Sequence, residues 1–301
     1  MNSSNLIGEI AGLATSLFYA VNAIFITKAS KQVGSTISNR VRVAFALIYL
    51  VIINLIFFKE PLPFHATSDR WVWLSLSGMI GLAFGDAFLF QSYLMVGPQI
   101  GSLLLSLSPI VGALEAWIFF HESLTPLKIL GILLTLAGII WVVVARGSNM
   151  TQTKKHMLAG VMYGILSAIF QATGFVFSKQ GLAGNFSPFQ ANAIRMLAAF
   201  FILVLIMLLQ KESNQTIQTL RTNSGTLKLL AIAGFIGPVL GVSASLLSVQ
   251  YAEVGVASTL TSLSPVFMLP LGYFFLNEEI HWTSVAGTIL ALLGVAILFL
   301  T

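Results

Sequence analysis

Long apolar runs follow one another along almost the whole chain and constrain its fold more than any other feature. A run of about 18 or more apolar residues is long enough to cross a bilayer as a helix. Ten such runs can be delimited: Leu6–Thr27, Ser35–Phe58, Trp71–Leu94, Ile100–Phe120, Leu127–Val144, Met157–Phe177, Pro188–Leu209, Leu227–Ser248, Val256–Leu276 and Trp282–Leu300. The connecting segments are too short to fold as soluble domains. We therefore predict an all-α membrane protein with ten transmembrane helices.

The scarcity of charge excludes other broad classes of protein. Charged residues make up 8% of the 301 residues and apolar residues 57%, whereas a soluble domain carries about 25% charged residues. The 15 Lys and Arg residues are scattered singly along the chain. A nucleic-acid-binding protein gathers such residues on one surface, so we expect no nucleic-acid partner. The absence of cysteine excludes disulfides and thiolate-bound metals.

The chain also contains an internal duplication. Residues 77–141 align with residues 233–297 without a gap, and glycines, a proline and a glutamate fall in register. Within this alignment the run Ser106–Pro109 matches Ser262–Pro265. A leucine-rich composition explains chance matches of Leu but not of Gly, Pro and Glu. Internal repeats of this kind indicate two copies of one structural unit.

We predict that the two repeats cover residues 5–146 and 157–301, with five membrane spans in each. Because five is an odd number, the second repeat enters the membrane from the opposite side. Inverted repeats of this kind are typical of secondary transporters, which bind their substrate between the two halves. The sequence therefore predicts alternating access to a central site.

Several of these residues resemble a known repeat. The run Ser106–Pro109, followed by Glu115, Glu122 and Pro126, is similar to the EamA repeat of the drug/metabolite transporter superfamily. So is the run Ser262–Pro265 followed by Glu278, and the segment from Tyr19 to Lys28 is similar to that family's first helix. The resemblance implies ten helices around a cavity and export of small organic solutes such as amino acids. We also predict that the chain lies in the cell (inner) membrane and has no enzymatic activity.

Two arguments give opposite orientations for the termini. More Lys and Arg residues follow the first, fifth and seventh apolar runs than the second, fourth and sixth. The positive-inside rule then places both termini outside the cell. The family resemblance instead implies cytoplasmic termini.

Two of the carboxylates within predicted membrane spans are functional candidates, because an ionisable group is costly there. Asp86 has apolar neighbours on both sides, and Glu115 lies near the end of its span. Both are candidate proton-coupling residues. The alternative for Asp86 is a structural ion pair or a hydrogen bond to another helix, and for Glu115 a side chain that reaches water. At the position in the second repeat that matches Asp86, the residue is Val242.

Arg42 and Arg195 occupy matching positions in the two repeats. Arginine offers a planar fork suited to a carboxylate or phosphate, so Arg195 is a candidate for binding an anionic or zwitterionic substrate. The alternative is that each arginine extends to the nearer interface or pairs with an acid such as Asp86 or Glu115. The candidate substrate-binding set is completed by neutral polar residues: Tyr19, Asn22, Gln91, Gln171 and Ser245. Interhelical hydrogen bonding is the alternative for these residues.

Pro109 and Pro265 fall near the middle of two predicted spans, where a proline removes a backbone hydrogen bond and kinks the helix. We predict a hinge at each, with a static kink as the alternative. The histidines lie in or beside loops, so neither a metal site nor a cofactor is expected. The expected partners are a small-molecule substrate, protons and the lipid bilayer, for a monomer or homodimer. A passive channel or a lipid-flipping subunit on the same repeat is the alternative function.

Overall fold

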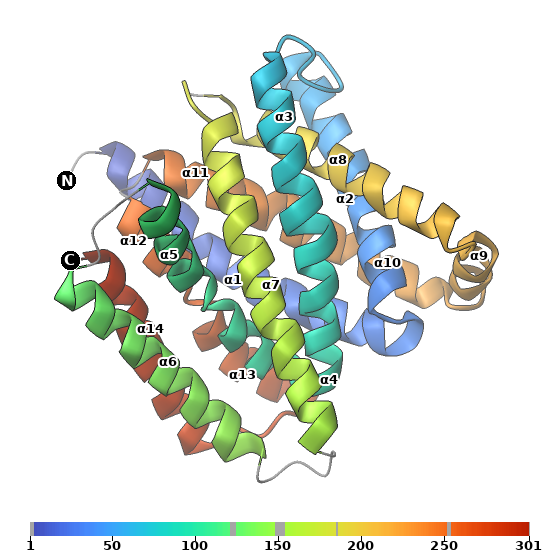
Figure 1. Cartoon of the computed structure of the whole chain (residues 1–301). Helices are drawn as coiled ribbons and strands as arrows, with labels where there is room; N and C mark the ends of the chain where they lie inside the picture. Colours follow the sequence, from blue (N-terminus) through green and yellow to red (C-terminus); the bar gives the residue numbers. More distant parts are fainter. Residues whose placement is uncertain (1–2, 121–124, 148–153, 185, 252–253, 301) are drawn as a thin grey trace.

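The computed structural model describes residues 3–120, 125–147, 154–184, 186–251 and 254–300, and every regular element in these ranges is helical. The helices pack side by side, with α1 in the interior (Figure 1). The elements in chain order are α1 (Ser3–Val33), α2 (Ser35–Phe58), α3 (Ser68–Ser77), η1 (Gly78–Gly85), α4 (Asp86–Leu105), α5 (Ser108–Phe120), α6 (Pro126–Gly147), α7 (Lys154–Gly181), α8 (Pro188–Leu209), α9 (Ser213–Thr222), α10 (Ser224–Gly234), η2 (Phe235–Val242), α11 (Ser243–Tyr251), α12 (Val254–Thr261), α13 (Ser264–Leu276) and α14 (Trp282–Leu300). The segments η1 and η2 are π-helical.

Eight helical stretches of the described residues are long and apolar enough to cross a membrane. A shorter apolar helix covers Trp282–Leu298. The chain is therefore an all-α, multi-pass membrane protein. Its helices do not correspond one by one to the ten predicted runs, because α3, η1 and α4 form one stretch from Ser68 to Leu105.

The boundary predicted between Leu94 and Ile100 falls on a kink within α4. Gly97 has φ 83° and ψ 157°, and Pro98 follows it. Glycine tolerates a positive φ because it has no Cβ, and proline adds no N–H that would need an acceptor. The chain therefore changes direction here, and α4 consists of two helical segments that meet at the non-helical Gly97.

The interruptions predicted at Pro109 and Pro265 take the form of breaks between two helices rather than kinks within one continuous helix. Pro109 is the second residue of α5 and Pro265 the second residue of α13, and two non-helical residues precede each of these helices. Proline is favoured in the first turn of a helix, because an N–H there has no intrahelical acceptor. The repeated Ser-Leu-Ser-Pro sequence therefore marks the start of a helix in each half.

Equivalent glycines in the two halves allow equivalent close contacts between helices. A Cβ atom on Gly78 would overlap the carbonyl oxygen of Arg195 in α8. A Cβ atom on the matching Gly234 would lie 3.0 Å from the carbonyl oxygen of Arg42 in α2. Each half thus contributes a helix that packs, at a glycine, against the arginine-bearing helix of the other half.

The helices α2 and α8 lie against each other and run antiparallel. Near the start of α2, Nη1 of Arg40 lies 2.7 Å from Oε2 of Glu212, which follows the end of α8. Near the start of α8, Nε2 of Gln190 donates to Oε1 of Glu60, which follows the end of α2, at 3.0 Å. At each end of this helix pair, a carboxylate therefore forms a contact between the two helices.

Candidate functional site: a polar central cavity

A cavity of about 620 Å³ lies among the helices and receives side chains from both halves. Of the predicted substrate-binding residues, four line it: Tyr19, Asn22, Gln171 and Ser245. Asp86, Pro109 and Pro265 also line it. The structure therefore brings most of the candidate residues to one place.

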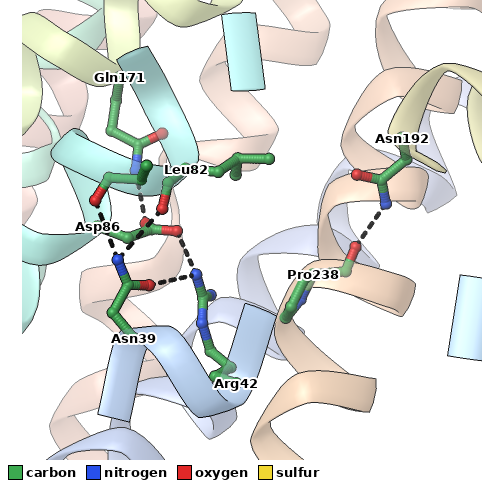
Figure 2. A network of polar contacts seen from close by, with 8 residues as sticks. Asn39, Arg42, Leu82, Asp86, Gln171, Asn192 and Pro238 are labelled. Atoms are coloured by element: carbon green, nitrogen blue, oxygen red, sulfur yellow. Dashed lines mark hydrogen bonds and ion pairs between the residues drawn. The ribbon is translucent and has the colours of Figure 1, made fainter. Parts of the chain in front are cut away.

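Asp86 is the centre of a buried polar network (Figure 2). Nη2 of Arg42 lies 2.5 Å from Oδ2 of Asp86, and Nε2 of Gln171 donates to Oδ1 of Asp86 at 2.7 Å. Arg42 is only 3% exposed and Asp86 6%. The guanidinium also lies over the ring of Phe90, with a distance of 4.8 Å to the ring centroid. Asp86 thus connects α2, α4 and α7 at the wall of the cavity. An ion pair of this kind was the alternative to proton coupling that the sequence left open for Asp86.

Two asparagines bind the π-helical segments in the same way. Nδ2 of Asn39 donates to the carbonyl oxygens of Leu82 and Ala83 in η1, at 3.4 and 3.0 Å. In the second half, Nδ2 of Asn192 donates to the carbonyl oxygen of Pro238 in η2, at 2.7 Å (Figure 2). A π-helix is rare and its hydrogen bonding departs from the regular pattern. These amides provide a donor for carbonyl groups at that irregularity.

In the described part of the second half, the ion pair of the first half has no counterpart. Arg195 is 2% exposed, and within the described residues no acceptor contacts its Nε or Nη1 atom. Its guanidinium lies 5.9 Å from the ring centroid of Phe175, which lines the cavity. Arg195 itself is not among the lining residues. It lies behind the wall of the cavity, beside Gly81 and Gln171.

The remaining candidates, Gln91 and Glu115, lie outside the cavity lining. Oε1 of Gln91 accepts a hydrogen bond from the hydroxyl of Ser35 at 2.7 Å, so this amide connects α2 and α4. Oε1 of Glu115 accepts one from the hydroxyl of Thr173 at 2.6 Å, which connects α5 and α7. Glu122, part of the sequence motif, lies outside the described residues.

Two basic residues of the cavity wall were not candidates from the sequence. Lys128 at the start of α6 and Lys179 near the end of α7 both line the cavity. Neither forms an ion pair with a described carboxylate. Because both flank apolar runs, the sequence indicated only that they fix the orientation of the spans. The described part of the chain contains no cluster of three or more His, Cys, Asp or Glu residues suited to a metal ion.

Comparison with known proteins agrees with this architecture. The model of the EamA-like transporter family matches residues 6–144 and 158–300. One solved crystal structure aligns with the whole chain and 97% of its own length, with a TM-score of 0.64 and 17% identity. At that identity the likeness concerns the fold alone.

Several curated relatives are similar in sequence. An uncharacterized transporter of Clostridium kluyveri is 28% identical over 144 residues, which are 48% of this chain and 45% of that protein. A chloroplastic WAT1-related protein of Arabidopsis thaliana is 24% identical over 78% of this chain and 56% of its own length. The uncharacterized transporter YyaM of Bacillus subtilis is 22% identical over 83% of this chain and 80% of its own length. The chain spans about half the length of the first two relatives.

Proposed function

The chain belongs to the EamA-like transporter family, and on this premise we propose that it is a secondary transporter of small organic metabolites. The observation that carries the proposal is the cavity of about 620 Å³ with a buried Arg42–Asp86 ion pair in its wall. Buried ionisable groups in membrane-spanning helices are expensive and are typical of substrate and proton pathways. An apolar cavity with a few placed polar groups is the usual form of a small-molecule site.

Alternating access in this proposal comes from two inverted repeats of five spans each. Three observations support it. The kink at Gly97 divides the long stretch Ser68–Leu105 into two segments. Residues at matching positions make matching contacts, as Asn39 and Asn192 do with η1 and η2. The equivalent helices α2 and α8 run antiparallel, as inverted topology requires.

The proposed cycle assigns a role to each candidate residue. Substrate binds among Tyr19, Asn22, Gln171 and Ser245, which line the cavity, while Gln91 supports α4 through Ser35. Asp86 couples transport to protons by exchanging its ion pair with Arg42 for a proton, and Glu115 serves as a second proton site. The breaks before Pro109 and Pro265 act as the hinges. The transporter exports amino acids or related solutes across the inner membrane, as a monomer or homodimer.

The first test compares the metabolites released by cells that express the parent, the Asp86→Asn variant or an empty vector. We expect a metabolite that accumulates outside only with the parent. Insertion of the variant is checked by its amount in the membrane fraction. The metabolite is then used for counterflow in proteoliposomes, because a passive channel exchanges label without transient accumulation. No release and no counterflow would contradict the proposal.

A further inference from the structure

The further inference concerns the charge of the substrate and begins with two equivalent places in the cavity. In the first half, Asp86 receives hydrogen bonds from Arg42 and Gln171. In the second half, the matching residues are Val242, Arg195 and Tyr19. The two places are built alike, because a Cβ on Gly85 would lie 3.4 Å from Gln171 and a Cβ on the matching Gly241 would lie 2.8 Å from Tyr19. The second half therefore has the donors of this site but no carboxylate.

Among the described residues no carboxylate lies within ion-pair distance of Arg195, and Asp86, whose charge acts on Arg195, is itself paired with Arg42. The buried Nε and Nη1 atoms of Arg195 lack acceptors among these residues. Oδ1 of Asn192, one turn before Arg195, is also buried without a partner, although the matching Oδ1 of Asn39 accepts from Arg42 at 3.1 Å. A buried charge without a partner destabilises a protein strongly. Such a residue is better tolerated if an anion reaches it during the functional cycle.

The charges of the cavity wall favour such an anion. Four charged residues line the cavity within the described residues: Arg42, Asp86, Lys128 and Lys179. Arg42 and Asp86 neutralise each other, so the two lysines leave an excess of positive charge. Val242, Tyr19 and Ser245 line the cavity where the second carboxylate is missing. A negatively charged ligand would be attracted to this wall, whereas a cation would be repelled by it.

We propose that the transported substrate carries a carboxylate, and that this carboxylate occupies the place beside Val242 that corresponds to Asp86. It accepts hydrogen bonds from the guanidinium of Arg195 and the hydroxyl of Tyr19, as Asp86 accepts them from Arg42 and Gln171. On binding, Arg195 turns from Phe175 toward Val242 and takes the orientation that Arg42 has in the first half. The identification of this ligand as the substrate rests on the proposed transport function, whereas its binding does not.

The substitution Val242→Asp tests the inference, because it supplies the missing carboxylate within the protein. Val242→Asn is the matched control, with nearly the same size and no charge. Without any ligand, we expect purified Val242→Asp to unfold at least about 2 °C above Val242→Asn, because only the aspartate neutralises Arg195. An equal or lower melting temperature for Val242→Asp would overturn the proposal.

Ligand binding is measured by the same thermal unfolding with carboxylates and their primary amides. The probes are acetate, benzoate, phenylacetate and L-phenylalanine, each beside its amide at equal concentration. We expect at least one acid, and no amide, to raise the melting temperature of the parent and of Val242→Asn. In Val242→Asp and Arg195→Gln, the apparent affinity for that acid should fall at least about tenfold. Equal stabilisation by acid and amide, or no stabilisation by any acid, would contradict the inference.

Counterflow separates this inference from the proposed function. If the acid binds as expected but shows no counterflow in proteoliposomes, the carboxylate site stands and the transport function is wrong. If acid and amide show equal counterflow in the parent, the transport function stands and the carboxylate specificity is wrong.

Discussion

The side-chain amide nitrogen of Asn39 lies 3.0 Å from the carbonyl oxygen of Ala83, inside the π-helical segment η1. The same side chain presents its oxygen to Arg42 at 3.1 Å. Asn39 therefore connects an irregular helix to the ion pair of the cavity wall. Asn192 makes the corresponding contact with η2.

Replacement of Asn39 by alanine should destabilise the protein by about 1–3 kcal/mol, because buried carbonyl groups lose their donor. Asn192→Ala should have a similar effect. Asn214→Ala is the control, because Asn214 is exposed in α9 and should change the stability little. Thermal unfolding in detergent micelles measures all three. If Asn39→Ala melted like Asn214→Ala, these hydrogen bonds would have no role in maintaining η1.

The Arg42–Asp86 pair predicts that removing both charges restores stability but not transport. Asp86→Asn leaves a buried guanidinium without its counterion, which should destabilise the protein by about 3–5 kcal/mol. The double variant Arg42→Met with Asp86→Leu removes both charges and should recover much of that stability. Counterflow should be lost in both variants, because neither can exchange an ion pair for a proton.

The outcome distinguishes a structural ion pair from a functional one. Recovery of transport together with stability in the double variant would show that the charges serve only the fold. Parent-like transport by Asp86→Asn at every pH tested would likewise remove Asp86 from the coupling mechanism.

The close contact between Gly78 and Arg195 predicts that three Gly→Ala substitutions differ in their cost to stability. Gly78→Ala would place a methyl group on the backbone of Arg195, where no side chain can move aside, and should cost about 1–3 kcal/mol. Gly234→Ala should cost less, because its Cβ would lie 3.0 Å from the nearest atom, the carbonyl oxygen of Arg42. Gly225→Ala should be neutral, because no described atom lies within 4 Å of its Cβ. Melting temperatures in any other order would contradict this account of the packing.

The sequence predicted an all-helical membrane protein, the EamA-like family and several residues that line the cavity, because each of these has a pattern within a single sequence. Apolar runs identify spans, and the polar residues Tyr19, Asn22, Gln171 and Ser245 stand out within them. The exact form of the break at Pro109 was not predicted, because a proline within an apolar run fits both a kinked helix and the start of a new helix. Only the contacts with neighbouring helices distinguish the two.

Other features depend on contacts between distant segments and had little local signal. The π-helical segments η1 and η2 accept hydrogen bonds from Asn39 and Asn192, which lie far from them in the sequence. These two asparagines were not among the candidate residues of the sequence. Lys128 and Lys179 lie at the ends of apolar runs, where a lysine usually faces water, so their place in the cavity wall required the fold.

The contact of Arg40 with Glu212 predicts that cross-linking this end of the α2–α8 pair stops transport. The chain has no cysteine, so Arg40→Cys with Glu212→Cys introduces the only two thiols, and a short bismaleimide can join them. Alternating access needs the two halves to separate at one end in each half-cycle, so the cross-linked protein should bind substrate but show no counterflow. Each single-cysteine variant treated with the same reagent should still show counterflow, because it loses one partner of the ion pair but cannot form the cross-link. Normal counterflow by the fully cross-linked protein would show that transport does not require α2 and α8 to separate at this end.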